Sequence, residues 1–278
     1  IICINDGSTD ETGKIVKAIG DERIILINQS NKGFSGARNR GIDESNGKYI
    51  MFLDSDDTLV GECIESMMNK IVQEKADIVQ GSFYSYVEGQ NNSNYCRLEN
   101  KIINEKNEMI GNPGYPWAKI YKREMFNELR FPLDVWFEDT IVCLILFRMC
   151  QKMVVTSEVV YAYRLNPNGI TLKARHNKKC VDHYWVMEYV LGKAKQLGLP
   201  NDELQYTLVK GHMSSLLYRR LSLQPEEVIE SAFVMACDLL GNIRPTNHVE
   251  SGRLIEKDIE KSLKTRNYKL WKLASFIV

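Results

Sequence analysis

Three aspartates follow a short apolar run near the start of the chain. The run YIMFL (49–53) leads directly into Asp54, Asp56 and Asp57. Repulsion among neighbouring carboxylates disfavours ionising all three, so a positive group is expected beside them. A divalent cation is the simplest candidate, because Mg²⁺ and Mn²⁺ take carboxylate oxygens and Mg²⁺ keeps positions for phosphates. The alternative is a solvated acidic turn, since aspartate favours turns.

Two further acidic positions could join this cluster. Asp6 follows the apolar run IICI, and Glu138 and Asp139 open the apolar segment EDTIVCLILFRMC (138–150). In open α/β sheets ligands bind beyond the carboxyl ends of strands, so Asp6 and the 54–57 cluster would share one rim if their strands are neighbours. Acidic residues also cap helices, so Glu138 and Asp139 are either catalytic or stabilise a helix start.

The elements that would position these residues alternate over the first eighty residues. Short apolar runs are followed by turn residues and then by helical periodicity, which predicts βαβ units and a mostly parallel sheet. Expected strands cover residues 1–4, 23–28, 49–53 and 76–87. Residues 88–115 are polar and predict a loop or insertion, and 138–150 predicts a buried helix. Beyond residue 176 the pattern is almost entirely helical, so we expect domains at 1–175 and 176–278.

Composition excludes several classes of protein. The 278 residues contain 36 basic and 36 acidic side chains, so no overall field attracts nucleic acid, and a phosphate-bearing partner needs a local site. The seven cysteines form no C-x-x-C pair and indicate reduced, buried thiols of a cytosolic protein. No apolar run approaches the roughly 20 residues of a membrane span. Both ends of the chain lie in apolar runs, so we expect a fragment of a longer protein.

Five motifs in order resemble the family 2 glycosyltransferases of the GT-A fold. They are NDGSTD (5–10), NKGFSGARNRGI (31–42), FLDSDD (52–57), WAKIYKREMF (117–126) and FEDT (137–140). The resemblance covers roughly residues 1–175. It implies a mixed, mostly parallel sheet flanked by helices, with a helical C-terminal extension. Family members normally begin with a further strand upstream, so the first strand would be missing here.

The resemblance also implies roles for individual residues. Asp6 and Asn31 would contact the uracil of a nucleotide-sugar, with Arg38 near the base or the phosphates. Asp54 would hold the ribose, with Ser55 beside it in the nucleotide site. Carboxylates suit this role because they accept hydrogen bonds from nucleotide N–H and hydroxyl groups.

The remaining implied roles concern metal, base and pocket. Asp56 would bind Mn²⁺ or Mg²⁺ at the diphosphate, and Asp139 would be the general base, with Glu138 beside it. His176 is either a third metal ligand or a solvated loop histidine. Trp117 and Lys119 would line the acceptor or sugar pocket, although Trp117 equally fits core packing.

The predicted function is inverting transfer of a hexosyl or N-acetylhexosaminyl group from a UDP-sugar. The acceptor would be a hydroxyl of a polysaccharide or of a lipid-linked glycan, in the cytoplasm or at the inner face of the cell membrane. Residues 261–278 mix basic and apolar side chains, as a membrane-surface helix does. An amphipathic helix that packs on its own domain has the same pattern.

Other classes fit less of the chain. FLDSDDTLV is similar to the D-x-D-G-T motif of haloacid-dehalogenase-like phosphohydrolases, but Asp57 replaces the glycine. A calcium loop starting at Asp54 has Leu59 where the sharp turn needs glycine. Gly33, Gly36 and Gly41 lack dinucleotide-binding spacing. A non-catalytic nucleotide-sugar-binding scaffold remains as an alternative that turnover would distinguish.

Overall fold

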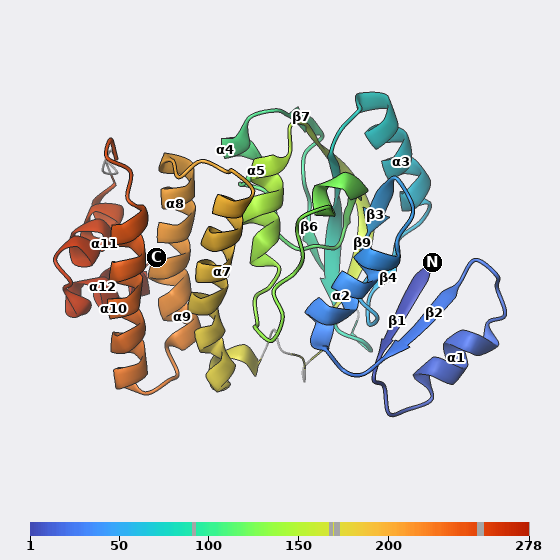
Figure 1. Cartoon of the computed structure of the whole chain (residues 1–278), viewed down its shortest axis with the longest axis horizontal. Helices are drawn as coiled ribbons and strands as arrows, with labels where there is room; N and C mark the ends of the chain where they lie inside the picture. Colours follow the sequence, from blue (N-terminus) through green and yellow to red (C-terminus); the bar gives the residue numbers. More distant parts are fainter. Residues whose placement is uncertain (91–92, 167–168, 170–172, 249–252, 278) are drawn as a thin grey trace. The chain divides into compact units, whose positions relative to one another are not determined.

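The chain folds into two compact units (Figure 1). The computed structural model describes residues 1–90, 93–166, 169, 173–248 and 253–277. The first unit comprises residues 1–134 and 138–165, and the second comprises 135–137 and 166–278. The division therefore falls at residue 165, earlier than the expected boundary at 175, and 135–137 pack with the second unit.

The first unit contains the strands that position the acidic motifs. Its strands are β1 (Ile2–Asp6), β2 (Ile25–Gln29), β3 (Tyr49–Met51), β4 (Thr58–Leu59), β5 (Ile78–Tyr86), β6 (Ser93–Cys96), β7 (Lys101–Ile103), β8 (Lys119–Lys122) and β9 (Met153–Arg164). Its helices are α1 (Thr12–Ala18), α2 (Gly33–Glu44), α3 (Cys63–Glu74), α4 (Lys106–Met109), η1 (Arg123–Phe126), η2 (Val142–Leu146) and α5 (Phe147–Met149). The segment 88–115, expected to be a loop or an insertion, contributes β6, β7 and α4.

The mixed α/β fold is confirmed, but its strand pairing is more antiparallel than predicted. β1 and β2 form a separate parallel pair, and β3, β8, β5, β9 and β4 follow one another in the larger sheet. Among the described strands of the larger sheet, β5 and β9 are the pair that runs parallel. The difference arises from β8, which lies between β3 and β5 and is antiparallel to both. β3 and β5 therefore point the same way without touching.

One face of the larger sheet packs against α3. Cys63, Met67 and Ile71 recur every four residues, so they form one buried stripe of that helix. This stripe contacts Val79 and Ile120 of the sheet within one apolar cluster. Burying each such side chain contributes about 1.5–3 kcal/mol, which holds the strand ends in fixed positions.

The helix predicted for residues 138–150 is present and buried. Its central turn is a π-helical segment, η2, followed by the α-helical turn α5. The segment 153–164 forms the single strand β9, with a register shift opposite Gly81 and Ser82. A Cβ at Gly81 would lie 2.4 Å from the Val160 side chain, so only glycine lets the two strands approach here.

The second unit is helical, as predicted for the C-terminal region. It contains η3 (Ala174–His176), η4 (Lys178–Val181), α7 (Asp182–Gln196), α8 (Glu203–Gly211), η5 (His212–Leu216), α9 (Leu217–Leu221), α10 (Glu226–Ile243), α11 (Leu254–Lys264) and α12 (Tyr268–Ile277). No helix in the described ranges is both long and apolar enough to cross a bilayer.

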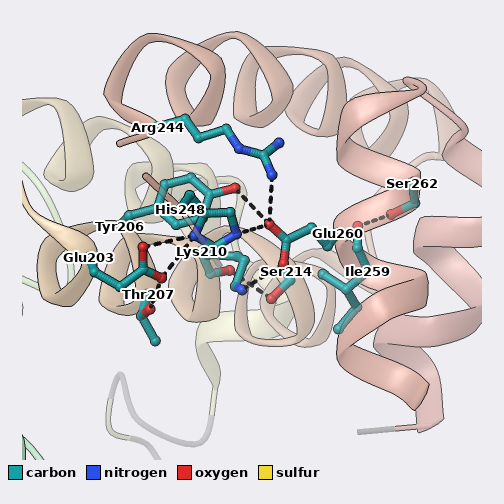
Figure 2. A network of polar contacts seen from close by, with 10 residues as sticks. All are labelled: Glu203, Tyr206, Thr207, Lys210, Ser214, Arg244, His248, Ile259, Glu260 and Ser262. Atoms are coloured by element: carbon teal, nitrogen blue, oxygen red, sulfur yellow. Dashed lines mark hydrogen bonds and ion pairs between the residues drawn. The ribbon is translucent and has the colours of Figure 1, made fainter. Parts of the chain in front are cut away.

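A buried carboxylate ties several of these helices together (Figure 2). Glu260 of α11 is 1% exposed and pairs with Lys210 at 3.1 Å and Arg244 at 3.3 Å. His248 also bonds Glu260 through Nε2, while its Nδ1 lies 2.8 Å from Glu203. His248 thus lies between the carboxylates of Glu203 and Glu260.

Candidate active site

The three aspartates after β3 have different surroundings. Asp57 accepts a hydrogen bond of 2.7 Å from the Tyr161 hydroxyl and one of 2.8 Å from the Arg164 backbone N–H. Both partners belong to β9, so Asp57 fixes the loop to the neighbouring strand. The Tyr161 hydroxyl also accepts the backbone N–H of Asp54 at 3.2 Å. Burial raises the pKa of the Asp57 carboxyl, although these hydrogen bonds oppose the shift.

Asp54 is paired with a cation from the protein itself. Arg38 of α2 donates to Asp54 at 2.9 Å and to Glu138, and its side chain is 13% exposed. The guanidinium lies 5.5 Å from the Phe131 ring centroid and 5.9 Å from that of Phe34, within cation–π range. The positive charge expected beside the acidic cluster is thus supplied in part by Arg38.

The electrostatics of the triad formed by Arg38, Asp54 and Glu138 favour a charged arginine. Burial alone would lower the pKa of Arg38, but Asp54 and Glu138 outweigh it and hold the pKa above its ordinary value. Burial, followed by the charge of Asp139, raises the pKa of Glu138 to about 7, while Arg38 opposes the shift. Arg38 therefore joins the end of β3 to the start of the helix that follows Asp139.

Asp56 is the aspartate left open to an external partner. Its carboxylate makes no hydrogen bond or ion pair with any residue in the described part of the chain, and it is only partly exposed. Ser55, beside it, is exposed at the turn. A carboxylate oxygen fits Mg²⁺ or Mn²⁺. Across the described ranges no cluster of three or more His, Cys, Asp and Glu side chains could hold a metal.

Asp6 and Asn31 are brought together by a glycine. Gly7 has a φ of +75°, and a Cβ there would lie 2.8 Å from the Asn31 backbone nitrogen. Asp6 accepts hydrogen bonds from the Gln29 amide at 2.6 Å and the Lys32 N–H at 2.9 Å. The end of β1 and the entry to α2 therefore lie side by side.

The strands carrying Asp6 and Asp54 do not pair with each other. β1 pairs with β2, whereas β3 pairs with β8 in the other sheet. The connection is made by α2, which packs on β1 and presents Arg38 to Asp54. The rim expected from neighbouring strands is therefore bridged by a helix.

Asp139 lies at the start of the helical segment and is half-buried. Its backbone carbonyl accepts the Val142 N–H at 2.8 Å, in the first helical turn. Its charge acts on Tyr115, Lys119 and Cys143. Asp139 thus directly follows Glu138, the partner of Arg38, and its charge acts on the loop that leads into β8.

Trp117 and Lys119 are more deeply buried than a pocket lining would be. Trp117 is stacked between Tyr115, with ring centroids 4.5 Å apart, and Tyr161, at 4.7 Å. Lys119 is 1% exposed and donates to the Tyr115 carbonyl at 2.6 Å. Both side chains support the loop from beneath.

His176 lies in the second unit and is exposed at the end of η3. Its proposed role as a metal ligand stays a prediction. Two shallow grooves lie along α3, lined among others by Lys70 and Glu158. None of the predicted site residues lines them.

Sequence reasoning missed the contribution of β9. Tyr161 connects Asp54 and Asp57, but it is one of several tyrosines in an apolar strand, and no local spacing signals the contact. The pairing of Arg38 with Glu138 joins positions 100 apart in the chain. The only available signal was the excess of carboxylates over cations among the motifs.

Residues 1–130 match the sequence model of the glycosyl transferase family 2. Over these residues the chain is similar to the family 2 glycosyltransferases.

Curated relatives agree with this assignment. Glycosyltransferase GlyA of Streptococcus pneumoniae is 32% identical over 187 residues, which cover 62% of this chain and 27% of GlyA. The uncharacterized glycosyltransferase EpsJ of Bacillus subtilis is 34% identical over 185 residues, covering 62% of this chain and 54% of EpsJ. The chain therefore spans between about a quarter and little more than half of these relatives.

The fold is that of solved relatives along almost its whole length. TarS 1–349 of S. aureus, crystallised with UDP-GlcNAc, superposes with a TM-score of 0.74 and 16% sequence identity. The match covers 99% of this chain and 81% of that one. At this identity the likeness establishes the GT-A-like fold with its helical C-terminal region.

Proposed function

We propose that this chain is the catalytic part of a glycosyltransferase that uses a UDP-sugar donor. Asp6 and Asn31 bind the base, and Asp54 and Ser55 face the ribose, as the resemblance implies. Support comes from the surface that Gly7 closes between Asp6 and Asn31. The structural relative TarS has been crystallised with UDP and with UDP-GlcNAc, which supports the same donor class here.

Asp56 is the residue that would hold Mn²⁺ or Mg²⁺. The observation behind this assignment is that Asp54 and Asp57 are engaged by Arg38 and Tyr161, whereas Asp56 has no described partner. When bound, the cation supplies charge neutralisation at the diphosphate leaving group. Because Asp56 is a single carboxylate, binding of metal and nucleotide is linked.

The proposed reaction is a single inverting displacement. Asp139 accepts the proton of an acceptor hydroxyl as its oxygen bonds to the anomeric carbon, and the bond from that carbon to the UDP oxygen breaks. General base catalysis of this kind contributes about 10²–10⁴ in rate. Arg38 and Glu138 hold the general base Asp139 in position relative to the loop that carries Asp54. Neither residue contacts the acceptor.

The acceptor is proposed to be a hydroxyl of a polysaccharide or lipid-linked glycan, in the cytoplasm or at the inner face of the membrane. Supporting this placement, α12 exposes Leu273, Phe276 and Ile277 beside lysines. Apolar side chains flanked by lysine suit peripheral contact with an anionic bilayer.

Asp139 at the helix start beside the Arg38 triad is the observation that carries the proposal. The test is UDP release from UDP-sugars, including UDP-GlcNAc, with glycan acceptors. Asp139→Asn should lower kcat by about 10²-fold or more while leaving UDP affinity unchanged. Glu128→Gln, at an exposed position, is the control and should retain activity. Unchanged sugar transfer in Asp139→Asn would refute the assignment of the base.

A further inference from the structure

Tyr115 is an exposed aromatic residue with no role in the proposed reaction as described above. It is 41% exposed, whereas Pro116 and Trp117, the next two residues of the chain, are buried. The Tyr115 hydroxyl makes no hydrogen bond with any residue in the described ranges. Part of the ring and its hydroxyl are therefore accessible to a ligand.

Buried aromatic rings support the inner face of Tyr115. Its ring lies nearly parallel to that of Trp117, at an angle of 2° and with ring centroids 4.5 Å apart. Trp117 in turn stacks on Tyr161 at 4.7 Å and on Tyr163 at 5.2 Å. Phe83 packs at right angles to the Tyr115 ring, with centroids 5.7 Å apart. Tyr115 is thus the exposed end of a stack of aromatic rings.

Two buried side chains fix the backbone beneath this ring. Lys119 Nζ donates to the Tyr115 carbonyl at 2.6 Å. The Tyr121 hydroxyl donates to the Pro116 carbonyl at 3.0 Å. Burying an ammonium group is costly, so a lysine that is 1% exposed and bound to this loop indicates that the position of the loop matters. A side chain held in one position loses less entropy when a ligand binds, so Tyr115 is preorganised for contact.

The chemistry of this surface fits a pyranose ring. A pyranose has an apolar face of C–H bonds with hydroxyl groups around its edge. The face of an aromatic ring packs against apolar C–H groups, and the tyrosine hydroxyl donates and accepts hydrogen bonds at the rim. A rigid tyrosine also supplies this amphipathic contact at a low cost in side-chain entropy.

The position of Tyr115 in the stack favours the acceptor over the donor. Trp117 lies between the rings of Tyr115 and Tyr161. The Tyr161 hydroxyl contacts the loop of Asp54 and Asp57, which is the loop proposed to hold the donor nucleotide. Tyr115 is therefore separated from that loop by the thickness of the tryptophan ring.

The residue before Tyr115 lies against the helix that follows Asp139. A Cβ at Gly114 would lie 3.3 Å from the Cβ of Cys143, so the two backbones are close. Cys143 follows Asp139 by about one helical turn. Tyr115 therefore lies next to the element whose start carries the proposed general base, where the acceptor hydroxyl must be bound.

We infer that the exposed face of Tyr115 binds the pyranose ring of the acceptor, and that Trp117, Lys119 and Tyr121 hold this face in place. The inference rests on the proposed function, because the acceptor is defined there as a hydroxyl of a glycan. Tyr115 takes the role that the sequence suggested for Trp117 and Lys119, which are buried beneath it.

Saturation-transfer NMR on the full chain, with UDP and Mn²⁺ present, tests the binding without any need for turnover. The probes are methyl β-D-glucopyranoside, methyl β-D-galactopyranoside and methyl N-acetyl-β-D-glucosaminide. At least one probe should bind, and Tyr115→Ala should weaken its binding about tenfold. Tyr115→Phe, which keeps the ring, should retain most of the binding. Sorbitol, which has hydroxyls but no ring face, should not bind.

Steady-state kinetics distinguish the two possible sources of the sugar. With an acceptor that supports UDP release, Tyr115→Ala should raise KM for the acceptor about tenfold and change KM for the UDP-sugar by less than about twofold. If Tyr115→Ala weakened binding of UDP-GlcNAc but not of UDP, the ring would hold the donor sugar and the inference would be wrong. Weaker binding of UDP itself would also contradict it.

Tyr95→Ala is the matched control. Tyr95 is 52% exposed and pairs with Tyr84, the residue after Phe83, so its side chain lies on the opposite face of the sheet. Its loss should change neither pyranoside binding nor KM for the acceptor. Binding of no probe to the wild type, or equal binding to Tyr115→Ala, would overturn the inference. Full activity of Asp139→Asn would instead overturn the proposed base, so the two failures are distinguishable.

Discussion

Neighbouring residues of one type perform different tasks because of where their side chains point. Asp57 is bound by Tyr161 and the Arg164 N–H, and Asp54 is bound by Arg38. Asp56 has no partner in the described ranges. Repulsion within the cluster is therefore relieved mainly by the protein, and one carboxylate is left for a cation.

Arg38 is the residue whose removal should be most costly here. In Arg38→Met the carboxylates of Asp54 and Glu138 lose their shared cation in a largely buried site. We expect destabilisation of about 3–5 kcal/mol in urea unfolding at pH 8. Arg38 lowers the pKa of Glu138, so its removal should raise that pKa further above about 7. The penalty should therefore shrink as the pH falls towards about 7, because Glu138 binds a proton at a higher pH in the folded variant than in the folded wild type, and it should level off at lower pH.

Arg40→Met is the matched control for this measurement. Arg40 lies on the same helix but forms an exposed pair with Glu44 one turn away. Its loss should change stability by less than about 1 kcal/mol, with little dependence on pH. Equal effects of the two substitutions would contradict a special role for Arg38.

At the scale of elements, periodicity predicted most helices and strands but not their pairing. The runs 1–4, 23–28 and 76–87 overlap the strands β1, β2 and β5, and 138–150 contains the buried helical segments η2 and α5. β8 was visible only as a motif, yet it separates β3 from β5 and makes the sheet mixed. Pairing depends on contacts between distant segments, which a local pattern does not contain.

For the candidate site, as for the fold, the sequence predicted positions but not the contacts between distant segments. Motif positions identified Asp6, Asn31 and the acidic cluster, and the structure places Asp6 against the Asn31 loop. The different surroundings of Asp54, Asp56 and Asp57 depend on contacts with Tyr161 and Arg38. These partners come from other elements, so spacing alone could not reveal them. Lys119 was expected in a pocket and is buried because β8 directs it inward.

The helices of the second unit depend on one buried acid. Glu260→Gln would leave Lys210, Arg244 and His248 without their shared carboxylate charge. We expect a loss of about 3–5 kcal/mol, because unpaired buried charges are strongly destabilising. Thermal unfolding followed by circular dichroism measures it. Glu226→Gln, which breaks an exposed pair with Lys272, should alter the midpoint far less. A Glu260 variant as stable as wild type would show that the network contributes nothing.

At the scale of the whole molecule, the balance of 36 basic and 36 acidic residues makes local placement of charge decisive. Several charged side chains are buried and paired within the fold, including Arg38, Glu138 and Glu260. All seven cysteines are unpaired, and Cys3, Cys96 and Cys143 are only partly buried.

The central claim is that the first unit binds a nucleotide and a cation together through the one open aspartate after β3. Isothermal titration calorimetry with UDP, in Mn²⁺ and in EDTA, tests it directly. The account predicts that Mn²⁺ strengthens UDP binding and that Asp56→Asn removes this enhancement while keeping the weaker, metal-free binding. UDP affinity that is equal with and without Mn²⁺, or a metal effect unchanged in Asp56→Asn, would contradict it.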